Sequence, residues 1–394
     1  MSPAPSIPAA SGPGYELDDD HRDFQEVCRA FVDREVRPLV REAERSQTFP
    51  AQLWPAMAAA GLLGVGHPEE HGGTGGGVLA LTILSEELGR SCGGIAITPL
   101  VSSYMAAPHL ARFGTDEQQR TWLAPVLAGE HVAAIAVTEP GAGSDVAGIQ
   151  ATARSADGGW TLHGTKMFIT NAGLADVIIV AARTEAGGER RHAGISTFLV
   201  RRGAEGMSMG RPLEKMGWHS SDTREVHFDG CFVGEDRLLG GEGRGFQQIM
   251  EAFQVERVLL AGMGLGLAEE AIADTVAHMR ARSAFGGPIG RMQALRHRVA
   301  EMRAAVDAAR LVTYQAAARC DAGHPGAGTS VAMAKLVAAR VACEVVDEAV
   351  QLFGGYGFIE ETPIAMHYRD ARILRIGGGT DEVQLEIIAK RMDL

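Results

Sequence analysis

The chain has 394 residues, of which 46% are hydrophobic and 22% are charged, and its formal net charge at pH 7 is −12. This composition is typical of a soluble globular protein with room for two or three domains. The negative charge, without any block of Lys or Arg, argues against nucleic-acid binding, and no apolar run reaches the roughly 18–20 residues that cross a bilayer.

Residues 1–14 contain no Lys or Arg and no apolar segment, so we expect a disordered tail rather than a signal peptide. Over residues 15–130 the apolar residues recur every three or four positions, as in HRDFQEVCRAFVDREVRPLV. This spacing predicts a helical domain. Asp18–Asp20 stand where acidic residues favour the start of the first helix.

Residues 131–242 have a different texture, with short β-prone runs such as AAIAV, ADVIIVAAR, STFLV and REVHFD. Turn residues bound these runs and no helical segments separate them, which predicts an antiparallel sheet or barrel. Over residues 243–394 the helical spacing returns. The order of helices, strands and helices predicts an α+β fold with a β domain between two helical ones.

Two glycine-rich segments could be mistaken for a dinucleotide fingerprint. GMGLG (262–266) lies inside a helical run rather than after a strand, and GGTGGG (72–77) reads as a loop. A nicotinamide-binding fold is therefore disfavoured, and close packing between helices is the better interpretation of GMGLG.

The five cysteines and thirteen histidines give no metal-binding pattern. No C-x-x-C pair occurs, and the one H-x-x-x-H spacing, His67 to His71, runs into the glycine-rich stretch PEEHGGTGGG, which reads as a loop rather than a helix. We expect reduced thiols, a cytoplasmic location and no bound metal.

Two motifs end a predicted strand with hydroxyl, amide and glycine groups. They are AVTEPGAGSDV (136–146) and KMFITNAG (166–173). Loops of this kind can hold a planar heterocycle or a phosphate, although each motif alone is also consistent with a β-turn.

At this separation the two motifs resemble those of the acyl-CoA dehydrogenase family. MGWHSSDTREVHFDG, RSAFGGPI, QLFGGYGF with RDARI, and GGGTDEV extend the resemblance, in the same order, over residues 16–394. It implies an N-terminal helical domain, a central antiparallel β domain and a C-terminal four-helix bundle. It also implies FAD as cofactor and a homotetramer or dimer.

The resemblance further implies roles for single residues. Thr138 and Thr170 match hydroxyls that bond the flavin ring, Phe168 matches an aromatic residue packed on it, and Ser144 lies where flavin and thioester meet. Eight more residues are implied FAD contacts, the first three from the neighbouring subunit: Arg282, Phe285, Gln293, Gln351, Gly354, Gly355, Thr380 and Glu382.

The implied reaction removes two hydrogens from an acyl thioester, a carboxylate taking the α proton and flavin N5 the β hydride. Many family members carry this base as a Glu where the present chain has Gly378. Isovaleryl- and long-chain-type members place it on an earlier helix, where Glu256 matches. Apolar neighbours at helical spacing predict that Glu256 is partly buried, which would raise its pKa. Arg257 resembles an Arg near the CoA site, and a structural ion pair is equally open.

The glycines of IGGGT have an expected role in this frame. Gly378 is expected to leave room for a bulky or branched acyl chain while its N–H donates to the thioester oxygen. Gly377 and Gly379 are expected to permit the turn. We also expect Gly378→Glu to restore part of the activity of a Glu256→Gln variant.

Several alternatives remain open at this point. The thioester carrier is coenzyme A or an acyl-carrier protein, and the expected electron acceptor in fatty acid metabolism is an electron-transfer flavoprotein. Flavin monooxygenases usually lack the carboxylate and nitroalkane oxidases use Asp, so Glu256 argues against both. A scaffold that has lost its flavin is disfavoured because the hydroxyl and glycine motifs are intact.

Overall fold

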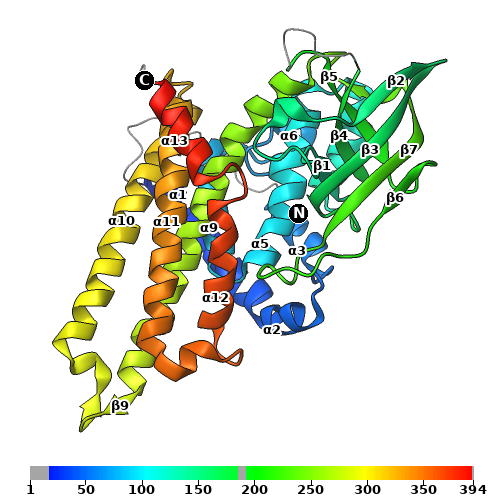
Figure 1. Ribbon diagram of the computed structural model, residues 1–394. Helices are drawn as coiled ribbons and strands as arrows, with labels where there is room; N and C mark the ends of the chain where they lie inside the picture. The colour runs from blue at the N-terminus through cyan, green and yellow to red at the C-terminus, as the bar shows by residue number, and fades with distance from the viewer. Residues whose placement is uncertain (1–16, 185–191, 393–394) are drawn as a thin grey trace.

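The computed structural model describes residues 17–184 and 192–392, and it confirms the predicted order of helices, strands and helices (Figure 1). The tail predicted over residues 1–14 lies outside the described residues. Within them, no helix is long and apolar enough to cross a membrane.

The N-terminal domain is helical, as predicted. Asp18 caps the first helix by accepting a hydrogen bond from the His21 N–H at 2.9 Å. The α-helices are α1 (Asp19–Phe31), α2 (Arg37–Ser46), α3 (Leu53–Ala59), α4 (Gly77–Gly89), α5 (Gly93–Pro99), α6 (Ala107–Phe113), α7 (Asp116–Gln118) and α8 (Ala124–Leu127). Three π-helical stretches, Val32–Val36, Leu100–Ala106 and Gln119–Leu123, join some of them.

An eight-stranded sheet follows, in the order β6-β7-β3-β2-β4-β5-β8, with β1 beside β4. Its strands are β1 (Ala133–Ala136), β2 (Thr152–Ala156), β3 (Gly159–Thr170), β4 (Val177–Arg183), β5 (Ile195–Arg201), β6 (Met207–Met209), β7 (Thr223–Gly234) and β8 (Leu238–Leu239). Most pairs are antiparallel, as expected, but β1 and β2 run parallel to β4. The β2–β3 hairpin supplies the long crossover that the parallel β1–β4 pair requires.

Strand β4 is buried on both faces, which explains its continuous apolar sequence. Val177 and Ile179 pack against the N-terminal helices, whereas Ile178 and Val180 point to the other face of the sheet and belong to the hydrophobic core of the β domain.

The C-terminal domain is a helical bundle around α9 (Gly245–Ala281), and Figure 1 shows α9, α10 and α11 side by side. The other helices are α10 (Gln293–Asp321), α11 (Ala327–Phe353), α12 (Pro363–Arg372) and α13 (Asp381–Lys390). A hairpin of β9 (Ser283–Ala284) and β10 (Gly287–Pro288) joins α9 to α10.

The GMGLG segment is confirmed as a close helix–helix contact. A Cβ atom on Gly262 would stand 2.7 Å from the Thr82 carbonyl oxygen of α4. A Cβ atom on Gly266 would overlap the Glu86 carbonyl oxygen one turn further along. Since only glycine leaves α4 and α9 room to approach this closely, the two glycines fix the position of α9.

Candidate active site

The N-terminal half of α9 and the glycine loop before α13 meet at one point. A Cβ atom built on Gly378 would stand 3.6 Å from Glu256 Oε1 and 2.5 Å from Leu260 Cδ1. Glu256 and Leu260 are one turn apart on α9, so both face the loop. The structure therefore brings together the two positions at which the sequence resemblance predicts the base.

The environment of Glu256 suits a group that exchanges protons near neutral pH. Its carboxyl group is half-buried and makes no hydrogen bond or ion pair with any other described residue. Burial raises the pKa of Glu256 to about 7, although the nearby cations Arg257 and Lys335 oppose this rise. A base with a pKa near the working pH is the most effective proton acceptor.

Two of the three glycines in the loop need their lack of a side chain. Gly378 has φ +64° and Gly379 has φ +92°, which is the left-handed region that favours glycine. Gly377 is outside this region and donates its N–H to the Ile373 carbonyl at 2.8 Å. The expectation that Gly377 also permits the turn is therefore wrong.

The carbonyl groups of the loop are held from three helices. The Gly378 oxygen accepts hydrogen bonds from Arg257 Nε at 3.2 Å and from Gln384 Nε2 at 3.3 Å. The Gly379 oxygen accepts from Gln384 Nε2 at 3.0 Å and from Lys335 Nζ. The Gly378 N–H donates to no other described residue, so it is available to an external acceptor.

Thr138 lies on the loop after β1 and Thr170 is the last residue of β3, and this loop is fastened to β3. The Thr138 carbonyl accepts a hydrogen bond from the Met167 N–H at 2.9 Å. Beneath this contact, the fully buried Lys166 pairs with Glu139 at 2.7 Å and donates to the Val137 carbonyl at 3.0 Å. This buried pair holds the first loop against β3, so that the half-buried threonine side chains keep a fixed separation.

Glu139 has further partners, because it also accepts hydrogen bonds from the N–H groups of Gln150 and Ala151. Sequence reasoning singled out the hydroxyl groups of these motifs and missed the Lys166–Glu139 pair. The signal that could have indicated it is the presence of Glu139 in one motif and Lys166 in the other, 27 positions apart.

Phe168 is displayed at the surface next to these loops. A register shift in the β3–β7 pairing lies between Lys166 and Ile169, and Phe168 within it has φ +60°. Its ring is 62% exposed. A non-glycine residue in this conformation is unusual and is often found at functional sites. Ser144 is also exposed, on the loop after β1.

The loop after β1 packs beside the start of α9. Val137 and Ala142 belong to one apolar cluster with Ile249, and Met250 and Phe253 of α9 pack against it. This cluster places the loop that carries Thr138 close to the turn that carries Glu256.

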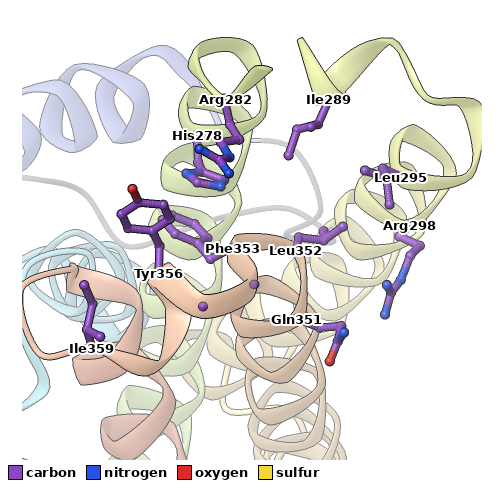
Figure 2. A pocket seen from close by; sticks show the side chains of 12 residues that line it. His278, Arg282, Ile289, Leu295, Arg298, Gln351, Leu352, Phe353, Tyr356 and Ile359 are labelled. Atoms are coloured by element: carbon purple, nitrogen blue, oxygen red, sulfur yellow. The ribbon is translucent and has the colours of Figure 1, made fainter. Parts of the chain in front are cut away.

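A second group of predicted residues lies at the other end of the bundle. Arg282, Gln351, Gly354 and Gly355 line a cleft of about 540 Å³, which Figure 2 shows together with the His278 and Tyr356 side chains. The His278 ring stacks on Phe353 at 4.3 Å between centroids, and Arg282 lies over the Tyr356 ring at 5.7 Å. Phe285 and Gln293 do not line this cleft, and Phe285 is 97% exposed.

The two groups are far apart within one chain. Glu256 and Arg282 are separated by 26 positions along or just beyond α9, or about 39 Å at the rise of an α-helix. Thr380, which caps α13 by accepting from the Val383 N–H, and the exposed Glu382 lie at the Glu256 end. One chain therefore does not bring all the predicted FAD contacts together.

No group of three or more His, Cys, Asp or Glu residues that could hold a metal ion occurs among residues 17–184 and 192–392.

Comparison with protein families gives one consistent result. Models described as the N-terminal, middle and C-terminal domains of acyl-CoA dehydrogenases match residues 18–130, 134–231 and 243–393. The chain is 37% identical over 377 residues to the short-chain specific acyl-CoA dehydrogenase of Megasphaera elsdenii, covering 95% of this chain and 98% of that one. It is 34% identical over 386 residues to isovaleryl-CoA dehydrogenase of Solanum tuberosum, covering 98% and 93%.

Solved structures are equally similar. Butyryl-CoA dehydrogenase of Megasphaera elsdenii superposes with a TM-score of 0.92 at 36% identity, covering 96% of this chain and 99% of that one. A chain from a structure of the electron transferring flavoprotein of Acidaminococcus fermentans gives 0.92 at 36% identity, covering 96% and 98%. PigA with FAD and proline gives 0.90 at 29% identity, covering 96% and 99%.

Proposed function

The chain belongs to the acyl-CoA dehydrogenase family, and we propose that it oxidises the Cα–Cβ bond of an acyl thioester with Glu256 as the base. The cofactor is FAD, which when bound supplies the acceptor for the β hydrogen and its electron pair. The observation that carries the proposal is the position of the Glu256 carboxylate, 3.6 Å from where a side chain at position 378 would begin.

Glu256 takes the α proton of the substrate, and its surroundings favour this role. With a pKa of about 7, a large share of the carboxyl groups is ionised at neutral pH, and burial makes the carboxylate a stronger base than an exposed one. The Gly378 N–H, which has no acceptor in the described chain, donates to the thioester oxygen as negative charge develops there. Ser144 and Arg257 contact the substrate.

Arg257 does not fit the alternative of a structural ion pair. Its Nε atom donates to the Gly378 carbonyl at 3.2 Å, and it pairs with no carboxylate in the described part of the chain. It therefore also holds the loop that presents the Gly378 N–H.

The residues at both ends of α9 fit the two halves of FAD. The Thr138 and Thr170 hydroxyls and the displayed Phe168 ring suit a planar heterocycle. At the distal cleft, the side-chain-free Gly354 and Gly355 and the Arg282 cation suit a pyrophosphate. Glu256, next to the first group, and Arg282, in the cleft, are about 39 Å apart along α9, so we propose that each FAD lies between two copies of the chain, in a dimer or homotetramer.

Phe285 and Gln293 come from the neighbouring copy in this assembly, and Thr380 and Glu382 from the copy that supplies Glu256. A fully exposed Phe285 ring with φ +51° is consistent with a residue that a second chain covers.

The size and branching of the acyl chain depend on how much space the missing side chain at Gly378 leaves. A branched or bulky acyl group is supported by the absence of that side chain, and the isovaleryl-CoA dehydrogenase relative agrees with it. Leu260 Cδ1 fills the first part of the space, however, which favours a short chain, as in the Megasphaera relative. Flavin bleaching by a panel of straight and branched acyl thioesters separates the two.

Coenzyme A is the favoured carrier, because the relatives are named for acyl-CoA substrates. An acyl-carrier protein is the alternative, and the same panel on both carriers distinguishes them. An electron-transfer flavoprotein is the proposed acceptor, and a cytoplasmic location stays a prediction from the cysteines. A monooxygenase or nitroalkane oxidase would consume oxygen rapidly after reduction, whereas a dehydrogenase would reduce the flavoprotein.

Glu256→Gln tests the assignment of the base. The variant keeps the size and polarity of the side chain but cannot accept the proton, so we expect flavin reduction by substrate to slow by about 10²–10⁴-fold. The measurement is stopped-flow bleaching of the flavin under anaerobic conditions, with Glu251→Gln, five residues earlier on α9, as the matched control. Reduction at the wild-type rate would refute the role of Glu256.

A further inference from the structure

Lys335 is a buried cation beside the proposed active site, and the proposed proton and hydride transfers give it no direct role. It lies on α11, its side chain is fully buried, and its Nζ atom donates to the Gly379 carbonyl. No carboxylate of the described chain is within ion-pair distance of it. Burying an ammonium group without a paired carboxylate costs free energy, so a merely structural residue at this position would be better apolar.

The glycine loop is the partner that Lys335 serves. Gln384, which is also fully buried, donates to the carbonyls of both Gly378 and Gly379, and Arg257 donates to that of Gly378. These three donors come from α13, α9 and α11, so the loop is fixed relative to three helices at once. Since each peptide unit is planar, fixing the carbonyls restricts the direction in which the Gly378 N–H points.

We propose that Lys335 is a positioning residue for the reaction, whose ammonium group holds the Gly378–Gly379 loop and supplies positive charge that favours the ionised form of Glu256. This inference rests on the proposed function, in which Glu256 is the base. Lys335 touches neither the reacting atoms nor the carboxylate, and it acts through the loop and through its charge.

Charged groups on α9, on α13 and on the 3₁₀ helix Ile373–Arg375 lie near this amine. Asp381 begins α13, Arg375 precedes that helix, and Glu256 and Arg257 face the amine from α9. Burial lowers the pKa of Lys335 to about 8, with Asp381 and Glu256 opposing that change and Arg257 and Arg375 adding to it. The ammonium form therefore predominates at neutral pH and is lost in mildly alkaline solution.

The sign of the pH dependence follows from these two groups. Glu256 must be ionised to accept a proton, so the rate rises as pH increases through its pKa of about 7. Lys335 must be protonated to hold the loop, so the rate falls as pH increases through its pKa of about 8. Removal of the Lys335 charge raises the pKa of Glu256 and moves the acid limb of the profile to higher pH.

Two substitutions at position 335 separate charge from packing. For Lys335→Met, which carries no charge at any pH, we expect a lower plateau rate without an alkaline limb, and an acid limb moved up by about one pH unit, so that rates at pH 6 fall by at least about tenfold. For Lys335→Arg, which stays protonated, we expect the acid limb to be unchanged and the alkaline limb to disappear. The measurement is the anaerobic rate of flavin bleaching from pH 6 to 9.5, on holoenzyme with full flavin content.

Two further variants guard against a trivial loss of folding. Arg340 lies on the same helix as Lys335 and donates to Asp381 at 3.1 Å, but it makes no hydrogen bond to the Gly378–Gly379 loop. The pH profile of Arg340→Gln should therefore match that of the wild type. Gln384→Met removes a neutral donor, so it should lower the rate at every pH without moving the acid limb.

The inference is overturned if Lys335→Met keeps the wild-type profile, or if Lys335→Arg loses activity as Lys335→Met does. Failure of this inference and of the proposed function can be told apart. An active Glu256→Gln enzyme refutes the function, whereas an inactive Glu256→Gln with an unchanged Lys335→Met refutes only the role of Lys335.

Discussion

Position 378 shows how one side chain on α9 constrains another residue far along the sequence. The left-handed φ of Gly378 and the proximity of Leu260 Cδ1 both oppose any side chain there. Glu256 and Leu260 together occupy the region that a residue at 378 would enter. The structure therefore does not support the expectation that Gly378→Glu alone restores activity to Glu256→Gln, because the left-handed φ disfavours a side chain there and Leu260 Cδ1 must move to admit it.

We predict instead that the base can be moved only when Leu260 is shortened. Glu256→Gln with Gly378→Glu should remain inactive, and addition of Leu260→Ala should recover measurable flavin reduction. Leu260→Ala alone is the control, since it retains Glu256 and should stay active while losing about 2–5 kcal/mol of stability. Recovery of activity in the double variant without Leu260→Ala would contradict this prediction.

At the scale of whole elements, the contact between α4 and α9 sets the frame of the site. Gly262 and Gly266 allow the backbones to meet, and partly buried ion pairs flank the contact. Glu86 on α4 bonds Arg310 of α10 at 2.9 Å, and Arg310 in turn bonds Glu269 of α9 at 2.7 Å. Because Glu256 lies on the same rigid helix, the position of its carboxylate depends on this packing.

We predict that Gly266→Ala destabilises the protein by at least about 1–3 kcal/mol, because the new methyl group overlaps the backbone of α4. Gly328→Ala is the matched control, since that helical glycine has no atoms near its Cβ position. Alanine has a higher helix propensity than glycine, so Gly328→Ala should leave the stability of the protein unchanged or raise it by up to about 1 kcal/mol. Denaturant unfolding of the holoenzyme measures both, and equal stabilities would contradict the assignment.

The sequence predicted these elements with uneven success. Hydrophobic spacing indicated the helices and strands, and the position of GMGLG inside a helical run indicated close packing. The parallel pairing of β1 with β4 could not be foreseen, because it depends on where the β2–β3 hairpin is inserted. Lys335 was missed because its acceptor lies 44 positions away and a lysine is ordinarily exposed to solvent. The meeting of Glu256 with Gly378 came from family resemblance, not from any local pattern.

On the scale of the whole molecule, the predicted FAD contacts divide between the two ends of the bundle. The division has a direct consequence for mixed oligomers. A site built from Glu256 of one copy and Arg282 of another loses activity when either residue is changed. If one chain carries only the change at 256 and the other only the change at 282, their mixed dimer keeps one site with both residues intact.

We predict that Glu256→Gln and Arg282→Glu chains, each inactive alone, recover activity when they are co-expressed. In a random dimeric mixture about a quarter of the sites combine an intact Glu256 with an intact Arg282. Flavin bleaching per bound FAD measures the recovery, with mixtures of separately folded, non-exchanging proteins as the control. No recovery in verified mixed oligomers would indicate that each chain binds FAD alone.

Helix α9 also has a mechanical consequence in the proposed assembly. The single helix α9 carries Glu256, the proton acceptor of one catalytic centre, and ends at Arg282, which contacts the pyrophosphate of FAD in another centre. A rotation of α9, or its translation along its own axis, would displace residues of both catalytic centres together. Cooperative turnover between neighbouring copies would then need no moving domain, only a stiff lever shared by both.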